Sequence, residues 1–201
     1  MSGRVFDPQG WIWKPFGWIG DIFIASCLWF VCSVPLFTVG TATTALYDCM
    51  VHCTRQNDGS VFSRFFRTFK REFKTATLAT FVWAAVIILG YCAIRLFGDR
   101  VAPTDSAVVV TVAALALLTV AIGVVCWVFP LLSRFTFSLG SLNTTAVKLA
   151  LSHMPATLAL GILTALSGYL CAQFWLPFVF LPGITALLWS FLLEPVFQKY
   201  M

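Results

Sequence analysis

The chain has 201 residues, of which 60% are hydrophobic and 10% are charged, with a formal net charge of +5. A typical globular domain carries about 25% charged residues, so 13 Lys plus Arg and 8 Asp plus Glu cannot coat a water-soluble surface around this much apolar sequence. The balance excludes a sizeable soluble enzyme domain, a disulfide-stapled secreted module and a nucleic-acid-binding surface. We therefore expect one all-α integral membrane domain over residues 1–201.

Membrane crossings are predicted from four windows without Asp, Glu, Lys or Arg, namely 22–47, 75–94, 106–133 and 149–193. About 20 apolar residues cross a bilayer as a helix, so the first three windows predict one crossing each and the last predicts two. The expected fold is a polytopic membrane helical bundle with five spanning helices and an in-plane amphipathic helix. A sixth segment is added if the short helix after the first crossing forms a hairpin with it.

The amino-terminal residues 1–20 combine several tryptophans with prolines and glycines. Tryptophan gathers at membrane interfaces, so this segment is expected to be a Trp-rich interfacial anchor. Asp21 is expected to open the first hydrophobic helix, and Pro35 to Gly40 to break it. Further along, we expect Pro130 to end the third crossing and Pro182 to kink the last one.

The stretch Thr41–Cys53 has a different pattern, with Thr41, Thr44, Asp48, His52 and Arg55 following one helix face and small or apolar residues following the other. It predicts an amphipathic helix too short to span, which lies at the interface or dips back as half of a hairpin. Asp48 and His52 are one turn apart and could hydrogen-bond or share a proton, so they are the candidate polar relay. Ordinary interfacial exposure is the alternative interpretation of this pair.

Residues 61–74 carry the clearest amphipathic pattern in the sequence. The aromatic face is Phe62, Phe65, Phe66, Phe69 and Phe73, and the basic face is Arg64, Arg67, Lys70, Arg71 and Lys74. A helix of this kind lies in the membrane plane, anchored on anionic lipid, and its basic face could also dock a cytoplasmic partner. These ten residues are the candidate docking set, and both roles remain open.

Orientation follows from the basic residues, which favour the cytoplasm. With five crossings, nine of them share the side that holds 55–74, and four share the other side. Residues 41–74 are therefore expected to form short amphipathic helices on the cytoplasmic side. If the short helix makes a true hairpin, the amino terminus also moves inside and the division becomes eleven to two, so its location stays open.

Residues in and around the proline break resemble the YesL family of small bacterial integral membrane proteins. The resemblance is carried by Pro35, Gly40, Thr43, Thr44, Tyr47, Asp48, Asp58 and Gly59, followed by the phenylalanine and lysine positions of the amphipathic helix. It covers about a quarter of the chain, and the second half matches only weakly. The family is largely of unknown function and is usually encountered beside carbohydrate ABC uptake systems, so the resemblance implies the bacterial plasma membrane and a similar setting.

Catalytic and cofactor motifs are missing from the sequence, which has two histidines and no HExxH, GxSxG or GxxxxGK[ST] pattern. Cys49, His52 and Cys53 fall within one turn but lack a fourth ligand of matching spacing, so no metal or other cofactor is expected. We expect a non-enzymatic accessory protein of carbohydrate uptake that contacts ABC importer permeases or their ATPase. The alternative is a small secondary transporter with its polar site around Asp48 and His52.

Overall fold

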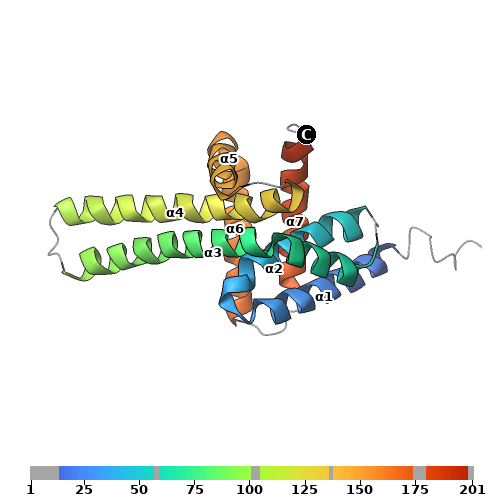
Figure 1. Ribbon diagram of the computed structural model, residues 1–201. Coiled ribbons are helices and arrows are strands. Elements are labelled where there is room, and N and C mark those ends of the chain that lie inside the picture. The colour runs from blue at the N-terminus through green and yellow to red at the C-terminus, as the bar shows by residue number, and fades with distance from the viewer. Residues whose placement is uncertain (1–13, 57–58, 101–104, 136–137, 174–179, 199–201) are drawn as a thin grey trace, which may run out of the picture.

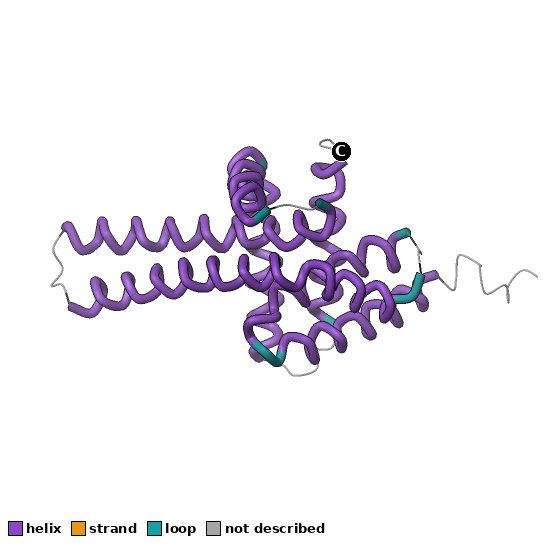
Figure 2. Tube along the Cα trace, in the orientation of Figure 1, coloured by secondary structure: helices purple, strands orange, loops and turns teal. Residues whose placement is uncertain are grey.

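The computed structural model describes residues 14–56, 59–100, 105–135, 138–173 and 180–198. Every regular element in these ranges is helical, as Figure 2 shows, which agrees with the all-α expectation. In this part of the chain the α-helices are α1 (Lys14–Ser33), α2 (Val39–Cys49), α3 (Val61–Arg100), α4 (Asp105–Arg134), α5 (Leu139–Ser152), α6 (Met154–Gln173) and α7 (Leu181–Gln198). A 3₁₀ turn, η1 (Leu36–Thr38), precedes α2, and a π-helical segment, η2 (Met50–Arg55), continues it.

The helices do not stand in one parallel bundle. In Figure 1 the long helices α3 and α4 lie side by side, and α6 and α7 run crosswise to them. Helix α2 lies in the middle and contacts α1, α3, α4 and α7. Helices α1 and α2 contact each other and are joined through η1, with Pro35 between α1 and η1, so they form a helical hairpin.

Helix α2 lies in the interior of the protein, which agrees with the predicted hairpin rather than with a helix that exposes one polar face at the interface. Nine of its eleven residues are buried, from both predicted faces: Gly40, Thr41, Ala42, Thr44, Ala45, Leu46, Tyr47, Asp48 and Cys49. Its glycine, alanine and threonine residues allow other helices to approach closely, as small residues do between membrane helices. The polar face is covered by neighbouring helices that supply its hydrogen-bond partners.

Gly40 shows how close that approach is. A Cβ atom there would clash with the Thr80 hydroxyl of α3 and the Phe129 ring of α4, with 2.8 Å to the Phe129 Cζ atom. Sequence analysis places Gly40 in a helix break, whereas the structure places it inside α2. Glycine is needed here for space between three helices.

Helix α3 is continuous over 40 residues. The predicted amphipathic helix 61–74 is therefore not a separate in-plane helix but the first part of α3, because nothing in the sequence interrupts the helix at Lys74. A stripe along this helix faces the interior, and it consists of Val61, Phe65, Thr68, Glu72, Ala76 and Ala79. The stripe packs the amphipathic half against the rest of the protein.

Three described helical stretches are long and apolar enough to cross a membrane, namely Val61–Cys92, Met154–Cys171 and Leu181–Gln198. This supports a membrane protein, although five such stretches are not found among the described residues. Two further apolar stretches, Gly17–Ser33 within α1 and Thr119–Arg134 within α4, are shorter than these three.

Three local expectations are corrected at helix ends. Helix α1 begins at Lys14 rather than Asp21, and residues 1–13 of the predicted anchor lie outside the described residues. Pro130 does not end α4, which continues to Arg134. Pro182 is the second residue of α7, where a missing backbone N–H costs no intrahelical bond and produces no kink.

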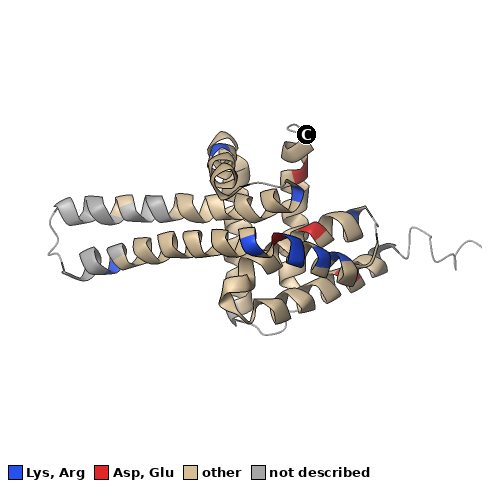
Figure 3. Cartoon of the chain, viewed as in Figure 1, with Lys and Arg blue, Asp and Glu red and all other residues tan. Residues whose placement is uncertain are grey.

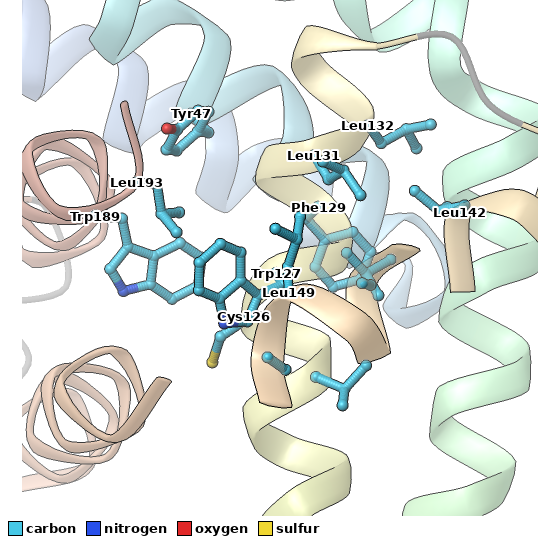
Figure 4. Packing of buried hydrophobic residues seen from close by; sticks show 14 of the residues in the cluster. Tyr47, Cys126, Trp127, Phe129, Leu131, Leu132, Leu142, Leu149, Trp189 and Leu193 are labelled. Atoms are coloured by element: carbon cyan, nitrogen blue, oxygen red, sulfur yellow. The ribbon is translucent and has the colours of Figure 1, made fainter. Parts of the chain in front are cut away.

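Two hydrophobic clusters hold the helices together. The larger joins Tyr47 to residues of α3 through α7, and Figure 4 shows Tyr47, Trp127 and Trp189 among its members. The smaller joins α1, α2, η2 and the start of α3 around Phe65. Buried polar side chains on the same helices, among them Asp48 and Glu194, define the candidate site.

Candidate functional site

Asp48 is the first centre of a buried polar network. Its carboxylate is 2% exposed and accepts hydrogen bonds from α3, at 2.8 Å from Arg64 Nε, 3.3 Å from Arg64 Nη2 and 2.7 Å from the Thr68 hydroxyl. Arg64 thus binds both carboxylate oxygens, the fork geometry that makes arginine–carboxylate pairs strong. This pair joins α2 to α3 in the interior.

Glu194 is the second centre, on α7. Its Oε1 atom accepts from Arg134 of α4, at 2.6 Å from Nη2 and 2.8 Å from Nε, and the Tyr47 hydroxyl donates to the same oxygen at 3.4 Å. The Arg134 and Glu194 side chains are only 10% and 8% exposed. This pair joins α4 to α7, with α2 attached through Tyr47.

His52 connects the two centres. Its Nε2 atom is 3.0 Å from Arg134 Nη1 and 3.5 Å from Asp48 Oδ1. An arginine only donates, so Nε2 must accept from Arg134, which places the proton of a neutral ring on Nδ1. In this arrangement His52 has no proton to give Asp48, so the two side chains are neighbours without a direct proton-sharing bond.

The environment of His52 keeps it neutral. Burial is the largest effect and lowers the pKa of His52, and the guanidinium groups of Arg64 and Arg134 lower it further. The Asp48 carboxylate and a hydrogen bond with Gln56 raise this pKa, but the net shift is a lowering. Burial, reinforced by the Glu194 charge, raises the pKa of the Tyr47 phenol. The network therefore consists of two arginine–carboxylate ion pairs, and a neutral histidine and a neutral phenol contact these pairs.

The backbone around His52 is unusual. Residues 50–55 form a π-helical turn, and the N–H of Gln56 donates to the Val51 carbonyl five residues back at 3.3 Å. Arg55, at its end, donates from Nη1 to the Ser190 carbonyl at 2.9 Å and stacks over Phe191 of α7. Single π-helical turns are frequent at functional sites. Here the wide turn directs His52 and Arg55 toward α4 and α7.

The predicted docking set is divided by the structure. Among the basic residues, Arg64 is turned inward to Asp48, whereas Arg67, Lys70, Arg71 and Lys74 are exposed. These four follow one face at spacings of three and four residues and form what we term the basic stripe, on the first half of α3 (Figure 3). Arg71 also contacts the buried Glu72 carboxylate at 2.6 Å.

The aromatic face of the same helix is divided too. Phe65 is fully buried, Phe66 and Phe69 are partly buried, and Phe62 and Phe73 are exposed. The five rings contact one another along the helix, with centroid separations from 4.9 to 6.1 Å. Phe65 and Phe69 belong to the core around α1 and α2, which leaves Phe62 and Phe73 at the surface.

The residues that carry the family resemblance line the hairpin and its contacts. Thr43 donates to the Val39 carbonyl and accepts from the Trp29 indole at 3.1 Å, while Thr44 donates to the Gly40 carbonyl at 2.9 Å. Gly59 has φ +79°, a left-handed conformation that favours glycine in the turn before α3. Asp58 lies outside the described residues.

A largely apolar cavity of about 540 Å³ adjoins the network. It lies between α1, α2, α3, α4, α6 and α7, and Tyr47 contributes to its wall.

The described ranges contain no group of three or more His, Cys, Asp or Glu side chains that could hold a metal ion. Cys49 is instead buried, with its thiol 3.6 Å from the Val61 carbonyl.

Sequence reasoning missed the partners of Asp48 and the pair formed by Arg134 and Glu194. Glu194 could be recognised as the first charged residue after the apolar window 149–193, and Arg134 as the first charged residue after the window 106–133. A buried charge requires a partner, which is the signal available in the sequence. Which two charges pair across 60 residues is visible only in the structure.

A model of a known protein family matches part of the chain. The profile of a family described as "Protein of unknown function, DUF624" matches residues 22–94, from α1 to most of α3. YesL is a member of that family, so the match supports the resemblance at the level of the family and over the part of the chain where it is strongest. No curated protein and no solved structure matches the chain.

Proposed function

We propose that this chain is a non-enzymatic accessory protein of the bacterial plasma membrane that serves carbohydrate uptake by contacting ABC importer components through the basic stripe. The carbohydrate setting comes from the resemblance to YesL proteins. The observation that carries the contact is the exposed stripe on α3, Arg67, Lys70, Arg71 and Lys74, which holds four positive charges on one helix face.

The interior charges support this proposal over transport. Asp48, Arg64, Arg134 and Glu194 bind one another, so the groups that a solute site would need are occupied by protein partners. Removing these partners would leave buried charges uncompensated, at a cost of several kcal/mol. The buried network thus holds four helices together, while the stripe remains available to a partner.

An acidic surface is the chemistry that the stripe would recognise. Within the described residues, neither Arg67, Lys70 nor Lys74 forms an ion pair. Exposed charges of this kind chiefly guide association and determine its salt dependence. A cytoplasmic loop of a permease, or the ATPase, would present the complementary charges.

The test is co-purification of the tagged protein from native membranes in mild detergent, with bound proteins identified by mass spectrometry. The informative variant reverses Arg67, Lys70 and Lys74 to Glu and leaves Arg64 intact, because Arg64 stabilises the interior. Lys70→Glu and Lys148→Glu form a matched pair, since each reverses one exposed lysine on a different helix. Importer permeases or ATPase should accompany the wild type and Lys148→Glu, and be depleted with the stripe variants.

The proposal would be contradicted if the protein elutes alone. It would also be contradicted if importer components co-purify equally with the wild type and all variants. The second candidate is then a small secondary transporter, favoured by one observation, that Tyr47 belongs to both the cavity wall and the polar network. Its test is reconstitution in vesicles with Asp48→Asn and His52→Gln. Solute flux that these substitutions abolish, in folded protein, would favour transport.

A further inference from the structure

The cavity has a wall suited to hydrocarbon. It measures about 540 Å³, inside the roughly 300–1,000 Å³ range of ligand pockets. Aliphatic and aromatic side chains make up most of the wall, including Trp29, Leu46, Ile87, Ile122, Val125 and Phe129. A space of this size and polarity fits an apolar ligand better than water, which needs several polar partners.

The hydroxyl groups in the wall already donate hydrogen bonds to other groups of the protein. Thr164 donates to the Leu160 carbonyl at 2.6 Å, Ser167 to the Thr164 carbonyl at 3.0 Å, and Thr185 to the Leu181 carbonyl at 2.7 Å. Thr43 and Tyr47 likewise donate to Val39 and Glu194. A sugar, which needs donors for its many oxygens, would find almost none here.

Trp189 is the exception. It lines the cavity and is 6% exposed, and its indole nitrogen has no hydrogen-bond partner in the described part of the chain. A buried donor without a partner costs about 1–3 kcal/mol, so such groups are rare in native proteins. The indole nitrogen atom is itself almost inaccessible, so it adds no polar group to the surface of the cavity, which stays apolar.

The rim opens on helices that face lipid. Gly168 of α6 and Ile122 of α4 line the cavity and are exposed, and α6 and α7 are two of the stretches long and apolar enough to span. The surroundings of the opening would be the hydrocarbon of the bilayer. We infer that this cavity binds the acyl chain of a membrane lipid.

Photolabelling tests this on the full-length protein. The probes are phosphatidylcholine and a free fatty acid, each with a photoreactive diazirine in the chain, competed by the same lipid without diazirine. Gly168→Phe fills the opening, since a Cβ there meets no atom within 4 Å. Gly161→Phe is the matched control, because Gly161 is also on α6 with open space around it but does not line the cavity.

Saturable labelling of cavity-wall peptides is expected in the wild type and Gly161→Phe, and most of it should be lost in Gly168→Phe. Competition by phosphatidylcholine identifies a phospholipid chain, and competition by the fatty acid alone identifies a free acid. Unsaturable labelling, or equal labelling of the two glycine variants, would overturn the assignment.

Discussion

The ion pair of Arg134 and Glu194 offers the most direct test of the buried network. The substitution Arg134→Met keeps a long side chain but removes its charge. The buried Glu194 carboxylate then keeps only the Tyr47 hydroxyl, at 3.4 Å, of the partners described above. Breaking a buried pair on one side typically costs about 3–5 kcal/mol, because the remaining charge is uncompensated. We expect a loss of this size, and a similar loss for Glu194→Leu.

The double variant separates pairing from packing. With Arg134→Met and Glu194→Leu together, neither charge remains, and replacing a whole buried pair by apolar groups is often neutral or stabilising by about 1–4 kcal/mol. The double variant should therefore recover most of the stability lost by either single one. Lys148→Met, which removes an exposed cation of α5, serves as the control and should stay within about 0.5 kcal/mol of the wild type.

The assay is reversible unfolding of the detergent-purified protein in a denaturing detergent, followed by tryptophan fluorescence. Free energies of unfolding for the four members of the cycle give the interaction energy directly. If the single variants are as stable as the wild type, or if their losses simply add in the double variant, the two side chains are not a buried pair and the reasoning fails.

Three further predictions follow from the described contacts. Gly40→Ala should destabilise the protein by about 1–3 kcal/mol, because its Cβ would clash with α3 and α4, whereas Gly140→Ala, in open space, should not; equal midpoints for unfolding would contradict this. Thr68→Val keeps the shape but removes the 2.7 Å hydrogen bond to the Asp48 carboxylate, so a loss of about 1.5–3 kcal/mol is expected, and a value near zero would exclude that bond. The free energy of unfolding should fall as the pH drops below about 6.5, because His52 binds a proton in the unfolded chain but resists it in the folded protein. The fall should stop below the lowered pKa of His52. The free energy of unfolding of His52→Gln should depend less steeply on pH, and a slope identical to that of the wild type would refute the assignment.

The sequence by itself determined the class of the protein and much of its local structure. The charge-poor windows and the hydrophobic content predict an all-helical membrane protein, and Pro35 separates two helices as expected, with an extended backbone between α1 and η1. The aromatic and basic faces of residues 61–74 are likewise local properties, since their spacing along a helix does not depend on the rest of the chain.

Only the tertiary structure decided what covers each face. Helix α2 has the pattern of an interfacial helix, yet both its faces are buried, and Arg64 belongs to the basic face but binds Asp48 in the interior. The pairing of Arg134 with Glu194 joins residues 60 positions apart. Periodicity reports how polarity is distributed around a helix, but a polar face is equally compatible with water, lipid headgroups or an opposite charge on another helix. Which of these it meets depends on how distant segments pack.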